Sequence, residues 1–202
     1  MIEYIAHRIN TSAELRDLSE GLGVELDLRD CGERLILRHD PFGDGEEADR
    51  FFGDYGKRGT LIANIKSTGI EWRVIELLKK NGIEKYFLLD SSFPMIHALA
   101  SKDERRVAMR FSEFEGLDTV MNLKELIDWV WVDCFTFLPL DRTIFEAMKS
   151  AQLKLCLVSP ELQGHGDDIE RYARQLRLND IVPDAICTKA HNISRWQTAW
   201  MA

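Results

Sequence analysis

Short apolar runs alternate with amphipathic stretches along almost the whole chain. Eight of these runs have the length and the aliphatic or aromatic content of buried strands. They cover residues 4–7, 24–28, 61–65, 86–89, 107–110, 130–133, 155–158 and 185–188. Between and after them, apolar positions at helical spacing predict helices from Thr11 onward and over 70–81, 93–101, 123–129, 142–151, 168–177 and 192–200.

The order of these elements predicts an α/β fold. A further apolar run, 34–38, follows a turn at Gly32, so we expect it to pair with 24–28 as a β-hairpin. The other strands alternate with helices, which indicates right-handed crossovers and a parallel sheet. Eight such units close most naturally into a compact (β/α)8 TIM barrel, and 202 residues lie near the lower limit for that fold. We therefore expect a single barrel domain over 1–202, with the β-hairpin after strand 2.

Two parts of this expectation leave room for other structures. A doubly wound open sheet is the alternative to the barrel, because it uses the same alternation of strands and helices. The acidic, glycine-rich segment 43–59 is expected to form a long loop.

Composition narrows the possible partners and the compartment. The formal net charge of −8 argues against a general nucleic-acid or anionic-membrane surface. No run approaches the roughly 20 apolar residues of a membrane span, and the N-terminus lacks the pattern of a signal peptide. The four cysteines form no C-x-x-C pair, which favours reduced thiols. Together these features predict a cytoplasmic protein.

Glu25 and Asp27 form a carboxylate pair on the second predicted strand. Side chains alternate along a strand, so both carboxylates lie on one face. Two acids that point into a barrel repel each other and are costly to bury without a cation. A hard divalent ion such as Mg²⁺ or Ca²⁺ would remove that cost. The alternative is an edge strand whose polar face lies in water.

Other polar residues fall at the ends of neighbouring predicted strands. Asn64 and Lys66 repeat the one-residue spacing on the third strand, where an amide oxygen could join a metal and an ammonium could bind phosphate. His7 ends the first strand, and His39 follows the hairpin. A single histidine is usually structural, but two at strand ends beside an acidic pair favour a functional site. Asp90 and Asp133 end later predicted strands, and either of them could compensate for the neutral Asn64.

These residues give the chain a resemblance to a known family. The motifs that carry it are Ala6-His7-Arg8, Asn10-Thr11, Gly23-Val24-Glu25-Leu26-Asp27-Leu28 and Leu37-Arg38-His39-Asp40-Pro41. In order, spacing and chemistry they resemble the glycerophosphodiester phosphodiesterases, which belong to the phospholipase-C-like phosphodiesterase superfamily. The match is specific over the first 41 residues and looser beyond them.

The resemblance implies roles for particular residues. His7 and His39 would be the general acid–base pair, and Arg8 and Lys66 would bind the substrate phosphate. The reaction expected is hydrolysis or cyclisation of a small glycerophosphodiester-like substrate.

The resemblance also implies a divalent metal ion. Glu25 and Asp27 would be its ligands, and Asn64 stands where the family has a third acidic ligand. This departure supports an alternative function, in which a catalytically degenerate barrel binds a phosphate-containing ligand without converting it.

Overall fold

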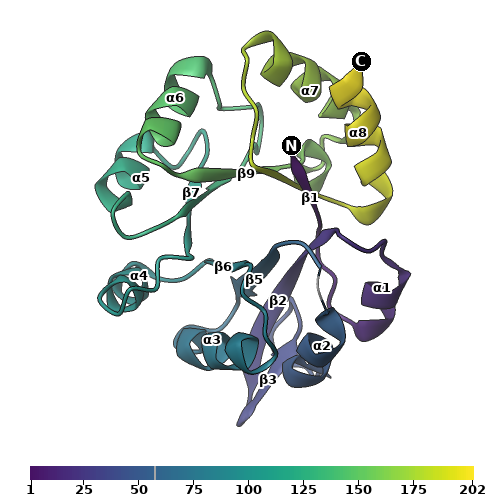
Figure 1. Ribbon diagram of the computed structural model, residues 1–202, viewed down its shortest axis with the longest axis vertical. Helices are drawn as coiled ribbons and strands as arrows, with labels where there is room; N and C mark the ends of the chain where they lie inside the picture. Colours follow the sequence, from purple (N-terminus) through teal and green to yellow (C-terminus); the bar gives the residue numbers. More distant parts are fainter. Residues whose placement is uncertain (57) are drawn as a thin grey trace. The chain divides into compact units, whose positions relative to one another are not determined.

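The computed structural model describes residues 1–56 and 58–202, which form two compact units (Figure 1). The N-terminal unit is Ile5–Val107, and the C-terminal unit consists of Met1–Tyr4 with Ala108–Ala202. Each unit contains parallel strands that alternate with helices. Both therefore have the α/β organisation expected from the sequence, while a single domain over 1–202 stays a prediction.

The N-terminal unit is built on parallel strands in the order β1, β2, β5, β6. Its elements are the end of β1 (Glu3–Ala6), α1 (Ser12–Asp17), β2 (Gly23–Cys31), β3 (Arg34–Leu37), β4 (Glu46–Glu47), α2 (Ala48–Tyr55), β5 (Leu61–Ile65), α3 (Glu71–Lys80), β6 (Tyr86–Leu89) and α4 (Phe93–Ala100). β3 returns antiparallel to β2 after a turn in which Gly32 has a φ of +61°, and β4 pairs antiparallel with β3.

β2 is buried on both of its faces, as expected for a parallel strand covered by helices. Val24, Leu26 and Leu28 fill one face, and the carboxylates of the other face are equally buried. The strand begins at Gly23, where a Cβ atom would lie only 2.6 Å from the carbonyl oxygen of Thr60. A glycine at this position lets β1, β2 and the start of β5 approach closely.

The expectation of a long loop over 43–59 is wrong, because β4 and α2 lie within it. The buried residues of α2 are Ala48, Phe51, Phe52 and Tyr55, whose spacing is that of one helical face. This face packs against β3, and α2 also contacts α3. The surrounding glycines and acidic residues of the segment hid this short amphipathic pattern.

The C-terminal unit has parallel strands in the order β10, β9, β8, β7. Its elements after β1 are β7 (Ala108–Phe111), α5 (Leu117–Leu123), β8 (Trp129–Val132), α6 (Arg142–Ser150), β9 (Lys154–Val158), the 3₁₀ turns Pro160–Gln163 and Gly166–Asp168, α7 (Ile169–Leu178), β10 (Ala185–Thr188), the 3₁₀ turn Ala190–Asn192 and α8 (Ile193–Met201).

The helix expected over 123–129 is wrong, since α5 ends at Leu123 and β8 already begins at Trp129. α5 begins instead after Gly116, and Asp118 in its first turn suits the positive end of the helix dipole. Ile127 is buried as the chain leads into β8, so its apolar character reflects packing and not helix periodicity.

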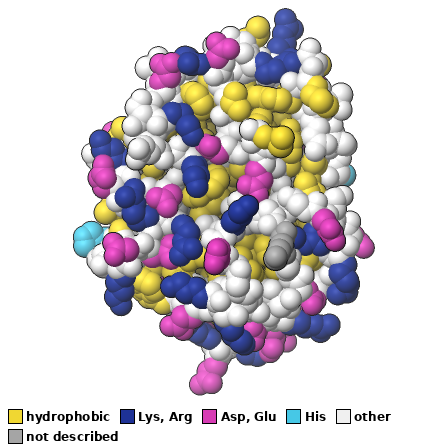
Figure 2. All heavy atoms as spheres, viewed as in Figure 1, with side chains coloured by type: hydrophobic (Ala, Val, Ile, Leu, Met, Phe, Trp, Pro, Cys, Tyr) yellow, Lys and Arg dark blue, Asp and Glu magenta, His cyan; other side chains and the backbone are white. Residues whose placement is uncertain are grey.

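The surface carries both signs of charge. On the face seen in Figure 2, Lys and Arg side chains are interspersed with Asp and Glu, and neither sign forms a large continuous patch. Among the described helices, none is both long enough and apolar enough to cross a membrane.

Candidate functional site

The predicted carboxylates lie side by side on β2 in the N-terminal unit, and each is about 1% exposed. Both Glu25 oxygens are occupied, since Oε1 accepts from Asn64 Nδ2 at 2.9 Å and Oε2 accepts from the Arg8 backbone N–H at 2.8 Å. Asp27 Oδ2 accepts from Asn10 Nδ2 at 2.9 Å. Within the described residues, Asp27 Oδ1 and Asn64 Oδ1 are buried and accept no hydrogen bond.

The loop after β1 is fastened to β2 by backbone and side-chain hydrogen bonds. Arg8 has a φ of +61°, a left-handed conformation that is uncommon for a residue other than glycine. Its N–H reaches the Glu25 carboxylate, and the next N–H, of Ile9, reaches the Glu25 carbonyl at 2.9 Å. Asn10 and Asp27 exchange two hydrogen bonds, of 2.9 and 2.8 Å. The loop is therefore built around the two acids.

The start of α1 keeps this loop short. Thr11 caps the helix by accepting the Glu14 backbone N–H at 3.2 Å, and the Glu14 carboxylate reaches back to the Asn10 N–H at 3.0 Å. The Glu14 carboxylate also accepts from the Thr11 hydroxyl at 2.9 Å, so Glu14 ties both Asn10 and Thr11 to the first turn of α1.

Basic side chains surround the carboxylates. His7 Nε2 lies 3.6 Å from Glu25 Oε2, and Arg8 Nε lies 3.6 Å from Asp27 Oδ2. Lys66 Nζ lies 3.7 Å from Asp27 Oδ1 and 3.3 Å from Asp90 Oδ2. Asp90 thus reaches the predicted site through Lys66.

Glu25 is the group whose protonation this arrangement alters most clearly. The pKa of Glu25 is raised to about 7, first by burial and then by the nearby negative charge of Asp27. The hydrogen bonds from Asn64 and Arg8 and the charge of Lys66 oppose the shift. A cation placed beside the pair would favour its ionised form.

His39 lies in the same unit, beyond the end of β3. Its Nδ1 is 2.8 Å from Asp40 Oδ1, and its side chain is about 40% exposed. The hydrogen bond from His39 lowers the pKa of Asp40, with smaller effects from Arg38 and Arg8. The backbone carbonyl of His39 accepts two bonds from the Arg29 guanidinium, at 3.0 and 2.8 Å.

The same unit offers oxygen ligands suited to a hard divalent ion. Asp27 Oδ1 and Asn64 Oδ1 are buried acceptors without donors, and such oxygens are what Mg²⁺ and Ca²⁺ bind. Their residues are direct partners on β2 and β5. Among described residues, no three His, Cys, Asp or Glu side chains gather as a metal site. The Asn64 amide oxygen is the further buried side-chain oxygen that lies beside the two carboxylates.

Comparison with solved structures reveals similar chains. A protein from Agrobacterium tumefaciens C58, provisionally assigned as a glycerophosphoryl diester phosphodiesterase, superposes with a TM-score of 0.70 at 13% identity, covering 100% of both chains. A glycerophosphodiester phosphodiesterase from the same strain gives 0.65 at 18% identity, again over 100% of both. A glycerophosphoryl diester phosphodiesterase from Parabacteroides distasonis gives 0.63 at 10% identity, over 98% of this chain and 87% of that one.

The chain has the fold of these proteins. The resemblance expected from the first 41 residues is thereby confirmed at the level of the fold. No protein-family model and no curated protein sequence matches the chain.

Within the N-terminal unit, direct contacts link six of the predicted residues: His7, Arg8, Glu25, Asp27, Asn64 and Lys66. His39, the seventh, joins them through its backbone and Arg29, which also donates to the Lys66 carbonyl at 2.8 Å. Sequence reasoning missed Arg29 and the role of Asn10. The signal for Arg29 was present, because it continues the alternation of Glu25 and Asp27 on one strand face.

The C-terminal unit has a polar cluster of its own at the end of β8. Asp133 is buried, and it accepts hydrogen bonds from Arg110, from Trp131 Nε1 at 3.0 Å and from Gln163 Nε2 at 2.8 Å. Burial raises the pKa of Asp133, while Arg110 opposes the shift. Both oxygens of the Asp133 carboxylate therefore accept hydrogen bonds from residues of the C-terminal unit.

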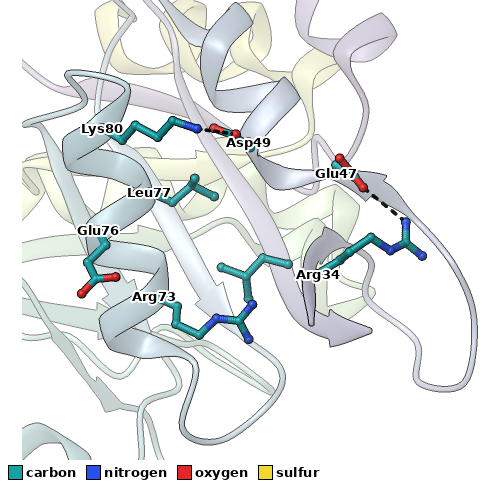
Figure 3. A pocket seen from close by; sticks show the side chains of 8 residues that line it. Arg34, Glu47, Asp49, Arg73, Glu76, Leu77 and Lys80 are labelled. Carbon is teal, nitrogen blue, oxygen red and sulfur yellow. Dashed lines mark hydrogen bonds and ion pairs between the residues drawn. The ribbon is translucent and has the colours of Figure 1, made fainter. Parts of the chain in front are cut away.

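A cavity of about 380 Å³ lies elsewhere on the N-terminal unit, between α3, β3 and the start of α2 (Figure 3). Its charged walls pair with each other: Lys80 Nζ is 2.6 Å from Asp49, and Arg34 is 3.6 Å from Glu47. None of the predicted site residues lines it. We therefore assign the cavity no part of the chemistry.

Proposed function

We propose that the protein is a phosphoric diester hydrolase that acts on a small glycerophosphodiester-like substrate. The observation that carries this proposal is the linked set around Glu25 and Asp27, in which His7, Arg8 and Lys66 bring a proton-transfer group and two cations to one carboxylate pair. The fold likeness to solved glycerophosphodiester phosphodiesterases supports the reaction class.

For the whole chain we propose the (β/α)8 TIM barrel, with the β2–β3 hairpin as its addition. Eight strands pair in parallel in the described residues, and helices or turns follow them. The likeness to the phosphodiesterase fold over the full chain supports closure. The C-terminal ends of barrel strands would then surround the site.

A divalent metal ion is the proposed cofactor, held by Glu25, Asp27 and the Asn64 amide oxygen. When bound, it would supply positive charge that neutralises a diester and stabilises charge developing in the transition state. Asn64 would bind the metal through Oδ1. Its Nδ2 now donates a hydrogen bond to Glu25, and this bond would either be kept beside the metal or be broken when the metal binds.

The chain's own residues would position the substrate and move its protons. Arg8 and Lys66 bind the phosphate oxygens. One histidine of the His7–His39 pair removes the proton from a substrate hydroxyl or from water, whose oxygen then attacks phosphorus. The other histidine donates a proton to the leaving alkoxide. Asp40 accepts from His39 Nδ1, which leaves Nε2 as the nitrogen for proton transfer.

A second function is favoured by one observation. Asn64 brings no negative charge and donates its amide to Glu25, so metal binding could be too weak for catalysis. The chain would then bind a phosphate-containing ligand through Arg8 and Lys66 without turning it over.

A substrate panel separates the two functions. The purified protein is incubated with glycerophosphodiesters and bis(4-nitrophenyl) phosphate, with saturating Mg²⁺ or Ca²⁺ or with EDTA, and products are followed by ³¹P NMR. We expect metal-dependent cleavage that falls at least about a hundredfold in His7→Ala. The matched control is His97→Ala on α4, which should retain the rate. Binding without cleavage, even in Asn64→Asp, would exclude the hydrolase and support the ligand-binding function.

A further inference from the structure

Arg29 follows the two acids along the same face of β2. The side-chain period of two places Glu25, Asp27 and Arg29 on that face in sequence. The acids are buried, whereas Arg29 is only half-buried. In the β-hairpin, Arg29 pairs with Ile36 of β3. Its long side chain can therefore reach beyond the edges of the neighbouring strands.

The guanidinium of Arg29 joins two backbone segments. Nε and Nη2 donate to the His39 carbonyl at 3.0 and 2.8 Å, and Nη1 donates to the Lys66 carbonyl at 2.8 Å. His39 follows β3 and Lys66 follows β5, which are the strands on either side of β2. One planar fork thus fixes the separation between these two segments.

These two carbonyls lie where the regular ladders stop. The last backbone bonds are Arg38 N–H to the Asp27 carbonyl at 2.9 Å and Lys66 N–H to the Leu28 carbonyl at 2.9 Å. Beyond them, β3 and β5 have no further strand bonds to β2 in the described registers. The carbonyls of His39 and Lys66 therefore lie at the point where the ladder bonds to β2 end, and the Arg29 guanidinium supplies hydrogen bonds to both of them.

We propose that Arg29 is a positioning residue that sets the His39 and Lys66 backbones relative to the acids of β2. This inference rests on the proposed function, in which His39 transfers a proton and Lys66 binds the substrate phosphate. Arg29 itself would touch neither substrate nor metal. Lysine cannot replace it, since an ammonium lacks the planar fork that holds both carbonyls.

The test compares Arg29→Lys with Arg58→Lys. Arg58 is a matched control because its guanidinium also donates three hydrogen bonds to backbone carbonyls in the same unit, in its case those of Leu15, Leu18 and Ser19. Uniformly ¹⁵N-labelled protein is examined by ¹H–¹⁵N NMR, which follows both the imidazole rings of the histidines and the Lys66 backbone amide. Turnover of the diester is measured in parallel.

In Arg29→Lys we expect the His39 ring and Lys66 amide signals to shift and broaden, while the His97 ring signals stay unchanged. Turnover should fall at least about tenfold, because small displacements of catalytic groups are costly. Arg58→Lys should leave both signals and kcat as in the wild type. A purely structural role for Arg29 would lower the Tm and leave the His39 ring signals in place.

Unchanged His39 and Lys66 signals in Arg29→Lys would overturn the proposal, whatever the kinetics. If the wild type shows no turnover, the proposed hydrolase fails, but the NMR comparison still decides the positioning role. Should Arg29→Lys not fold, Arg29→Gln provides the same comparison, because it removes the fork and keeps one amide donor.

Discussion

Asp27 and Asn64 are direct partners across the parallel ladder of β2 and β5, and each has one buried side-chain oxygen. In the part of the chain that the structure describes, neither oxygen accepts a hydrogen bond. Lys66 Nζ approaches the Asp27 oxygen only to 3.7 Å. Buried acceptors without donors are costly, so a cation bound between these strands would stabilise the fold.

Restoring a third carboxylate should strengthen metal binding. Asn64→Asp places a negative charge beside Glu25 and removes the amide that now donates to it. Without metal this repulsion should lower the Tm, and with Mg²⁺ or Ca²⁺ the Tm should rise more than in the wild type. Calorimetry should show affinity for the ion increased by at least about tenfold.

Asn81→Asp is the matched control for that variant. Asn81 also donates its amide to a carboxylate, that of Asp49, at 3.1 Å, but in α3's C-terminal turn and outside the predicted site. The Asn81→Asp variant should have a lower Tm than the wild type, by the same amount with and without Mg²⁺ or Ca²⁺. Equal ion affinity in wild type and Asn64→Asp would contradict the proposed ligand set.

The raised pKa of Glu25 predicts how metal-free stability changes with pH. Its pKa is about 7 in the folded protein and near 4.5 when the group is unperturbed. The folded state therefore holds a proton that the unfolded state loses over this window, so stability from this group falls as pH rises from about 4.5 to about 7. In EDTA, the Tm of Glu25→Gln relative to wild type should rise across the same window.

Glu104→Gln provides the control for this titration. Burial opposes ionisation of Glu104, but hydrogen bonds from Arg106 and Tyr86 outweigh it and lower the pKa of Glu104. Its contribution to stability is complete above the unfolded pKa, so the Tm difference from wild type should stay flat between about pH 6 and about pH 8. A flat difference for Glu25→Gln as well would show that Glu25 is ionised throughout.

A bell-shaped dependence of kcat/KM on pH is expected from the histidine pair. If His7 and His39 exchange acid and base roles, one must be neutral while the other is protonated. The two limbs would report macroscopic values of the pair and not of single residues. His39→Ala should remove one limb and lower turnover at least about a hundredfold, with ligand affinity largely kept.

Two variants of Arg8, which has a left-handed backbone conformation, distinguish the role of its side chain from that of its backbone. Arg8→Gly relieves the strain at φ +61°, whereas Arg8→Ala keeps it, so the glycine variant should be more stable than the alanine variant by about 1 kcal/mol. Both should bind inorganic phosphate more weakly, because both lack the guanidinium. Chemical denaturation and calorimetry measure the two effects, and equal stabilities would show that the conformation carries no strain.

The strands of the fold could be predicted from the sequence because buried parallel strands give short apolar runs with clear ends. β5 and β6 begin and end as expected over 61–65 and 86–89. α2 could not be predicted with the same rules, because its apolar face is short and lies between glycines and acids. Tertiary packing against β3 stabilises it, and no local signal reports that contact.

The site was predicted where chemistry and strand period coincide, as for Glu25 and Asp27. The roles of Arg29 and Asn10 depend on bonds to backbone groups far away in the sequence, such as that from Arg29 to the Lys66 carbonyl. Such bonds depend on where strands end in space, so side-chain type alone does not reveal them. The neutral Asn64 was visible in the sequence, but its hydrogen bond to Glu25 was not.

All the predicted site residues, from His7 to Lys66, lie within the N-terminal unit, in less than a third of the chain's length. A contiguous stretch of coding sequence therefore carries the candidate chemistry. Genetic exchange between related chains within this stretch could alter the ligand set, whereas exchange within the segment for Ala108–Ala202 would leave it intact.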